Sequence, residues 1–130
     1  MKYLKPLAIS IFAILIPIKA ALITAFILVC ADLIAGIAAS IKRGDHITSA
    51  GLQRTLVKGM IYEAVIILGF IAEKYLIGDF IPVTKIITSF IGLTELLSIF
   101  ESLNEISGGS LLKNLITKLQ SNNLPKDEDK

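Results

Sequence analysis

Three apolar stretches of this chain are long enough to cross a lipid bilayer, and no other feature constrains the fold so strongly. They run from Ala20 to Ile41, from Met60 to Ile77 and from Ile86 to Ile106. At about 1.5 Å per residue, a helix of roughly 20 residues crosses a ~30 Å hydrocarbon core. Each stretch is therefore predicted to form a transmembrane helix.

The composition agrees with a membrane environment. Hydrophobic residues make up 54% of the 130 residues and charged residues only 18%, against about 45–50% and about 25% in soluble globular domains. A soluble domain of this length is mostly surface and could not bury so many apolar side chains. We predict an all-α integral membrane protein with one transmembrane domain over residues 20–106.

A fourth apolar stretch, Leu7–Ile18, is shorter. A length of about 12 residues suits an interfacial helix or a short tilted span better than a full crossing, so residues 1–19 are assigned to a separate N-terminal apolar helix. The lysines before this stretch resemble the start of a signal peptide. Because Ile18 and Lys19 make a poor cleavage site, we favour a retained helix.

Polar connectors separate the apolar stretches. Lys42–His46 is a polar break, after which Ser49 is expected to cap a helix that begins near Gly51. Pro82 prevents a continuous helix between the second and third stretches. The pair Gly108–Gly109 is expected to end the third helix.

Residues 107–130 are predicted to form an amphipathic segment and a polar tail. Ser110 is expected to cap the segment. Its apolar residues recur at helical spacing; they are Leu111, Leu112, Leu115, Ile116 and Leu119. From Ser121 onward the chain is polar and is predicted to be disordered.

Basic residues in and after the first connector predict the orientation. The four expected at the membrane surface are Lys42, Arg43, Arg54 and Lys58. The positive-inside rule places this connector, and with it the C-terminus, in the cytoplasm. Lys2 and Lys5 favour the same side, which requires either that residues 3–18 also cross or that they lie flat on the inner face. The sequence thus leaves three or four spans open.

Of the acidic residues within the apolar stretches, Asp32, Glu63 and Glu95 are the three expected to lie in the membrane. An ionisable side chain in hydrocarbon costs several kcal/mol, so each requires an explanation. Asp32 either faces other helices or a water-filled lumen and helps to switch an assembly, or it is neutralised by a proton or hydrogen bond and stabilises packing. Glu63 lies near the end of its stretch, where placement at the interface explains it.

Small residues recur along one face of the first stretch. The set predicted to pack against another helix is Ala31, Ala35, Gly36, Ala39 and Ser40. In lipid, close backbone approach and interhelical hydrogen bonds drive helix association. The pattern predicts contact within a chain or between copies. Because so small a chain cannot enclose a useful pore, permeability would require a homo-oligomer.

Catalytic and cofactor motifs are missing from the sequence. It contains no HExxH, no GxSxG, no Gly-rich phosphate loop and no Cys/His cluster. Cys30 is the single cysteine, and His46 is expected to be solvated in its loop. The net charge of +2 comes without the interleaved basic and aromatic residues of a nucleic-acid surface. We therefore expect neither an enzyme nor a protein that binds a metal, a cofactor or nucleic acid.

Several short patterns occur together between residues 32 and 101. Asp32-Leu-Ile-Ala-Gly36 ends the first stretch, a basic-then-Ser connector and Lys58 follow, and Glu95-Leu-Leu-Ser-Ile-Phe-Glu101 lies in the third. Together they resemble the phage holin family that includes the clostridial toxin-secretion holins. The chain departs from the family pattern at Ser102, where Asn is usual, and in lacking a proline near Gly108.

This resemblance implies a protein of the bacterial cytoplasmic membrane that oligomerises and permeabilises it, releasing an endolysin or a toxin. An alternative that the residues also fit is a non-permeabilising anchor or assembly component of a phage or secretion complex. A small transporter with Asp32 or Glu95 as a proton relay is disfavoured, because no inverted repeat is visible.

Overall fold

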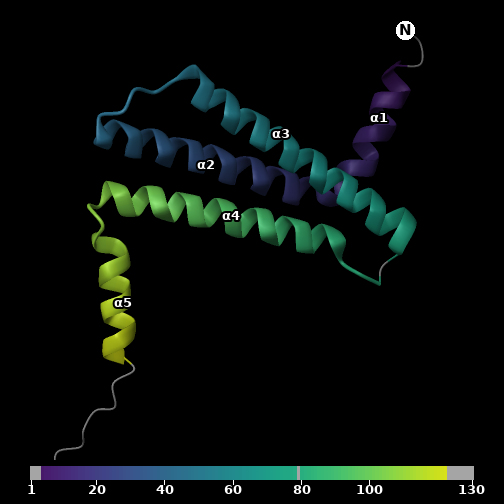
Figure 1. Cartoon of the computed structure of the whole chain (residues 1–130). Helices are drawn as coiled ribbons and strands as arrows, with labels where there is room; N and C mark the ends of the chain where they lie inside the picture. The colour runs from purple at the N-terminus through teal and green to yellow at the C-terminus, as the bar shows by residue number, and fades with distance from the viewer. Residues whose placement is uncertain (1–3, 79, 123–130) are drawn as a thin grey trace, which may run out of the picture.

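The computed structural model describes residues 4–78 and 80–122, and these residues form helices and short connections without a β-strand. The elements in chain order are α1 (Leu4–Leu15), η1 (Ile16–Ile18), α2 (Lys19–Arg43), α3 (Ser49–Ala72), η2 (Glu73–Ile77), α4 (Val83–Ile106) and α5 (Ser110–Asn122) (Figure 1). The predicted all-α fold is confirmed.

Three helical lengths are long and apolar enough to cross a membrane. They are Leu4–Arg43, Ser49–Ile77 and Val83–Ile106, and they contain the three predicted stretches, which confirms the expectation of three spans. Helices α2, α3 and α4 lie side by side, with α2 in contact with both others and most extensively with α4 (Figure 1).

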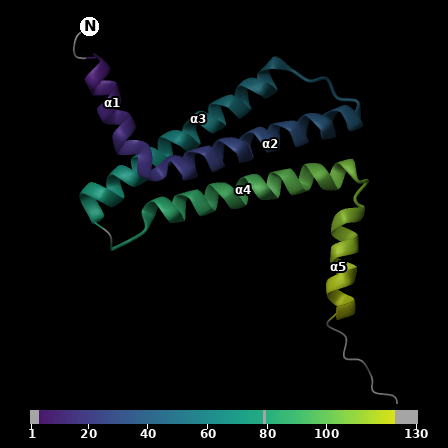
Figure 2. The ribbon, with the colours of Figure 1, turned by 180° about the vertical axis from the view of Figure 1, so that it is seen from behind.

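The N-terminal apolar stretch continues into the first span. A 3₁₀ turn that contains Pro17 joins α1 to α2, since proline lacks the N–H that a regular helix needs. Seen from both sides, α1 leaves the bundle at this turn (Figures 1 and 2). No residue of α1 is buried, and Ile18 is the one buried residue of the 3₁₀ turn.

The first connector ends α2 and starts α3. Gly44 adopts a left-handed conformation with φ 78°, which closes α2. The expectation that Ser49 caps α3 is wrong by one residue. Thr48 is the N-cap, and its Oγ1 accepts a hydrogen bond of 3.2 Å from the Gly51 amide, because the extended backbone of Thr48 brings its hydroxyl over the first turn.

The turn between α3 and α4 is closed by a carboxylate. The Thr84 amide, in the first turn of α4, donates a hydrogen bond of 2.6 Å to Glu73 Oε2. Pro82 precedes α4, as predicted. Glu73 lies in η2, a π-helical turn that ends α3, so this carboxylate satisfies one of the free N–H groups at the start of the next span.

The C-terminal end of α4 turns sharply into α5. Gly108 and Gly109 have φ of 73° and 79°, as expected for residues that end a helix. The expected Ser110 cap is not formed: Ser110 Oγ instead donates to the Ser107 carbonyl, and Asn104 Oδ1 accepts from the Leu112 amide at 3.2 Å. A side chain of α4 therefore caps α5.

Helix α5 also extends beyond the predicted start of the polar tail. It continues through Ser121 to Asn122, so the boundary at Ser121 was placed too early. The rest of the tail predicted to be disordered, residues 123–130, lies outside the described residues.

Apolar packing holds the three spans together at the end near η1. Ile18, Ala25, Ile66, Phe70 and Ile91 form a buried cluster. Ile66 of α3 is completely buried. Most other large apolar side chains of the spans stay exposed, as expected for surfaces that face lipid.

Ile66→Val is expected to lower the free energy of unfolding in detergent by about 0.5–1.5 kcal/mol, because it removes one methyl group from a fully packed site. Ile61→Val is the matched control, since Ile61 lies on the same helix and is 54% exposed; it should change stability by less than about 0.5 kcal/mol. Thermal unfolding of both variants measures the difference, and equal losses would contradict the packing described.

Candidate functional site: a polar network between the three spans

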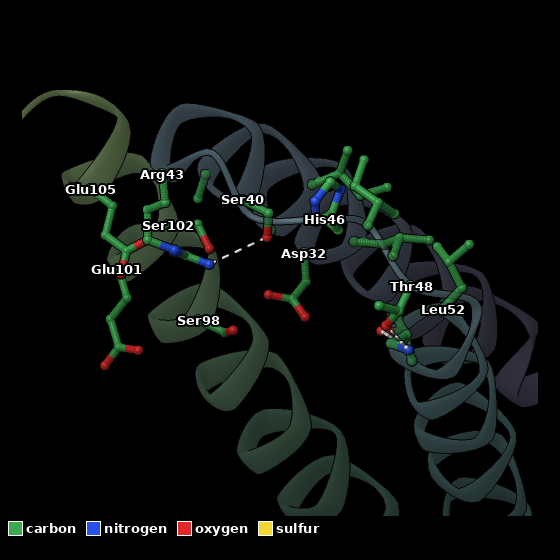
Figure 3. A pocket seen from close by; sticks show the side chains of 17 residues that line it. Asp32, Ser40, Arg43, His46, Thr48, Leu52, Ser98, Glu101, Ser102 and Glu105 are labelled. Carbon is green, nitrogen blue, oxygen red and sulfur yellow. Dashed lines mark hydrogen bonds and ion pairs between the residues drawn. The ribbon is translucent and has the colours of Figure 1, made fainter.

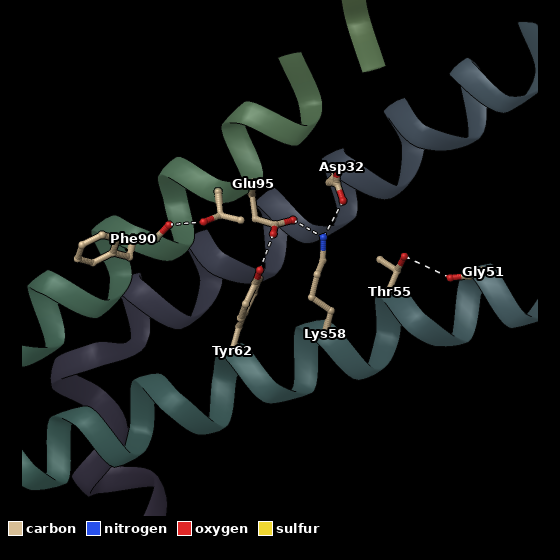
Figure 4. Close-up of polar contacts among 8 residues, drawn as sticks. Asp32, Gly51, Thr55, Lys58, Tyr62, Phe90 and Glu95 are labelled. Atoms are coloured by element: carbon tan, nitrogen blue, oxygen red, sulfur yellow. Dashed lines mark hydrogen bonds and ion pairs between the residues drawn. The ribbon is translucent and has the colours of Figure 1, made fainter. Parts of the chain in front are cut away.

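One side chain from α3 joins all three spans. Lys58 Nζ donates hydrogen bonds of 2.8 Å to Asp32 Oδ2 of α2 and of 2.8 Å to Glu95 Oε2 of α4 (Figure 4). Tyr62 OH donates a bond of 2.9 Å to the other carboxylate oxygen, Glu95 Oε1. These four residues are called the Lys58 network below.

The positions of these residues follow from helical geometry. Lys58 and Tyr62 are four residues apart, so they point from the same face of α3. Asp32 and Glu95 each lie well inside their helices, α2 and α4. The network therefore bridges the spans at a point that a bilayer would surround with hydrocarbon.

The network satisfies its most buried group completely. Glu95 has no exposed surface, and both of its carboxylate oxygens accept a hydrogen bond. Asp32 and Lys58 keep 13% and 33% of their side-chain surface. Opposite charges in a medium of low dielectric attract strongly, but removing one partner leaves an uncompensated charge. The three helices are thus bound together by charge as well as by packing.

Of the three acids predicted to lie in the membrane, the structure brings two together. Asp32 and Glu95 share Lys58, whereas Glu63 is half-buried elsewhere on α3 and has no hydrogen-bond or ion-pair partner among the described residues. Asp32 forms a hydrogen bond with a side chain of a neighbouring helix and also lines the polar cleft described below. Its surroundings are therefore compatible with a role in packing and with a role in an assembly that switches.

Lys58 does not lie where the sequence predicted. It was grouped with the basic membrane-surface residues, but its ammonium points inward between two carboxylates. The physical reason is that paired charges inside the bundle compensate each other, so the amine does not need to reach the headgroups. Tyr62 was not predicted at all; its spacing of four residues from Lys58 was the signal in the sequence.

The other three residues of the predicted basic surface, Lys42, Arg43 and Arg54, lie at the end of α2 and in the first turns of α3. Lys42 Nζ donates to the carbonyl of Glu105 at 3.2 Å and also to that of Ile106, and Arg43 forms an ion pair with Glu105. Arg54 is exposed near the start of α3. A cation on the last carbonyls of a helix stabilises its C-terminus, so these contacts hold the ends of α2 and α4 together.

A polar cleft opens between the spans at this same end. Its volume is about 370 Å³, and Asp32, Ser40, Arg43, Ser98 and Glu105 are among the residues that line it (Figure 3). Asp32 thus connects the cleft to the Lys58 network. Glu101 and the exposed His46, which was expected to be solvated, also line the cleft. The hydroxyl, carboxylate and guanidinium groups give this end of the bundle a surface that water can wet.

The small residues of α2 differ in how deeply they are buried. Ala35 and Ala39 are buried within the chain, whereas Gly36 lines the polar cleft, where an added Cβ would meet no atom within 4 Å. Ala31 and Ser40 are half-buried. A closer helix approach occurs at Gly69 of α3, where an added Cβ would collide with Ile87 of α4. Gly69 is not among the packing residues that the sequence predicts.

Metal-ligating side chains do not gather in the part of the chain that the structure describes. No group of three or more His, Cys, Asp or Glu residues there could hold an ion.

Comparison with protein families gives one match. Residues 10–122 match the model of the bacteriophage holin family. No match was found among curated proteins or among solved structures. The family match covers α2, α3, α4, the Lys58 network and α5.

Proposed function

Because the chain belongs to the bacteriophage holin family, we propose that it oligomerises in the bacterial cytoplasmic membrane and permeabilises it, so that an endolysin or a toxin is released. The family match over residues 10–122 carries this proposal. Three apolar spans in so short a chain support it, because one copy is too small to enclose a passage for a folded protein, whereas several copies together can.

The Lys58 network supplies the polar groups that such a lesion needs. In a single copy these groups are turned inward and satisfy one another. If the spans separate and regroup, the same carboxylates and the ammonium become available to water in a lumen. The resting and the open states would then use the same polar residues in different surroundings.

Expression of this chain alone in a bacterium tests the proposal. We expect the membrane potential to collapse abruptly at a reproducible time after induction, followed by lysis when an endolysin is present in the cytoplasm. A potential-sensitive dye reports the collapse. Accumulation in the membrane to a high level with the potential intact would refute permeabilisation.

A second function is favoured by one specific observation. Helix α5 extends away from the spans (Figures 1 and 2), as a docking element of a non-permeabilising anchor or assembly component would. If this alternative holds, deletion of residues 107–130 abolishes function while the spans still insert, and the full chain leaves the membrane potential intact. A holin in the sense proposed here depolarises the membrane.

The distribution of positive charge supports one orientation. Lys42 and Arg43 contact the end of α4, which precedes α5, and Arg54 lies in the second turn of α3, after the same connector. By the positive-inside rule this end belongs in the cytoplasm, and the C-terminus with it. A reporter fused after Lys130 that is active only in the cytoplasm should therefore be active.

Gly36→Leu is expected to weaken self-association if α2 contributes to the contact between copies. Gly36 lines the polar cleft, where an added Cβ meets no atom within 4 Å, so a leucine there can be accommodated within one chain while it blocks close approach of a second helix on this side of α2. Ala38→Leu, on the opposite side of α2, is the matched control. Cross-linking in membranes measures the effect, and an unchanged yield for Gly36→Leu would assign the contact to another span.

A further inference from the structure

Helix α5 has a continuous apolar face that nothing in the described chain covers. The five residues on it are 38–64% exposed; they are Leu111, Leu112, Leu115, Ile116 and Leu119. At 100° per residue these side chains occupy one side of the helix, and Asn114, Thr117 and Ser121 lie on the other. Exposure of an apolar face of this size to water is unfavourable, so it is expected to lie against an apolar surface.

The direction of α5 is built into the turn before it. In both views α5 runs crosswise to α4 (Figures 1 and 2). Gly109 N donates to the Asn104 carbonyl at 2.8 Å, and Asn104 Oδ1 accepts from the Leu112 amide. The first contact closes the turn that precedes α5, and the second ties the first turn of α5 to α4. Because α4 crosses the bilayer, a helix crosswise to its end lies along the membrane surface.

Charged contacts place the turn between α4 and α5 at the depth of the lipid headgroups. Lys42 reaches the last carbonyls of α4, and Arg43 pairs with Glu105. These charged residues mark where the bundle leaves the hydrocarbon. Helix α5 begins only four residues after Ile106, so its apolar face starts at the boundary between acyl chains and headgroups.

The charges of α5 match an anionic surface. Residues 110–122 contain Lys113 and Lys118 and no acidic residue. On the helical wheel the two lysines flank the apolar face on opposite sides, Lys118 beside Leu111 and Lys113 beyond Ile116. Lysines in these positions can extend to phosphate groups while their stems lie along lipid.

We propose that α5 binds flat on the phospholipid leaflet at this end of the bundle, with its apolar face about 5–10 Å into the boundary of the acyl chains and its lysines on anionic headgroups. This surface is additional to the three spans. It fixes the end of α4 to one leaflet, and it does so whether or not the protein permeabilises the membrane.

Fluorescence quenching on the full-length protein tests the proposal. In a Cys30→Ala background, Leu115→Cys places a label on the apolar face of α5, and Asn114→Cys places the same label on the polar side, about 100° away around the helix. The protein is reconstituted in vesicles of phosphatidylglycerol and phosphatidylethanolamine. We expect the Leu115→Cys label to lose most iodide quenching and to be quenched by lipids that carry a shallow nitroxide. The Asn114→Cys label should behave in the opposite way.

Two outcomes would overturn the proposal. Iodide quenching of both labels to the same extent would mean that α5 lies in water. A Leu115→Cys label that neither iodide nor the nitroxide lipid reaches, and whose fluorescence changes when labelled protein is diluted with unlabelled protein, would mean that a second copy covers the face. As a second measurement, Lys113→Gln with Lys118→Gln should restore iodide quenching of the Leu115→Cys label in part, and no restoration would refute the role of the headgroup charge.

Discussion

Lys58→Met is expected to lower the free energy of unfolding of the three-span bundle by about 3 kcal/mol, near the lower end of the range for breaking a buried ion pair. The substitution keeps an unbranched apolar stem but removes the charge that Asp32 and Glu95 share. Two carboxylates would then face each other without a cation, one of them fully buried. Unfolding in mixed micelles of mild detergent and dodecyl sulfate measures the loss.

The matched control removes the charges together. Lys58→Met combined with Asp32→Asn and Glu95→Gln leaves no unpaired ion, so the triple variant should recover most of the stability that the single variant loses. If the single and triple variants were equally unstable, the loss would come from side-chain packing, and the assignment of an ionic bond between the spans would be wrong.

The extent of the spans could be predicted because it is a local property. Residues 20–41, 60–77 and 86–106 each carry enough consecutive apolar residues to show their length directly. Pro82 and Gly108 act on the backbone within a few residues, so the helix ends near them were also predicted correctly. Both the extent of the spans and these helix ends depend only on residues close together in the sequence.

The direction of the Lys58 side chain was harder to predict than the bounds of α3. The helix begins at Ser49, eleven residues or about three turns before Met60, and the position of Lys58 before the apolar stretch therefore predicts a place at the membrane surface. Which way a side chain points depends on the rotation of its helix against the others. That rotation is set by contacts between distant residues such as Glu95 and Lys58.

A signal for the network was nevertheless present in the sequence. Two acidic residues within apolar spans require a compensating cation, and Lys58 with Tyr62 four residues later offered a donor pair on one helix face. The sequence alone does not show which cation pairs with Asp32 and Glu95, because Arg54 carries the same charge as Lys58 and lies one helical turn earlier. The choice between the two follows from the depth at which α2, α3 and α4 contact one another.

Asp32→Asn is expected to advance the onset of membrane depolarisation, a prediction that rests on the proposed function. It weakens the bond that Lys58 makes to α2, and a hydrogen bond between charged groups contributes about 1.5–3 kcal/mol. If the lesion forms from chains whose α3 has separated from α2, this loss raises the separated fraction roughly 10- to 100-fold. Because regrouping of spans depends on that fraction, depolarisation should begin earlier at equal protein level. Cys30→Ala is the matched control two residues away on the same helix; identical onset times for the two variants would show that Asp32 does not hold the resting state.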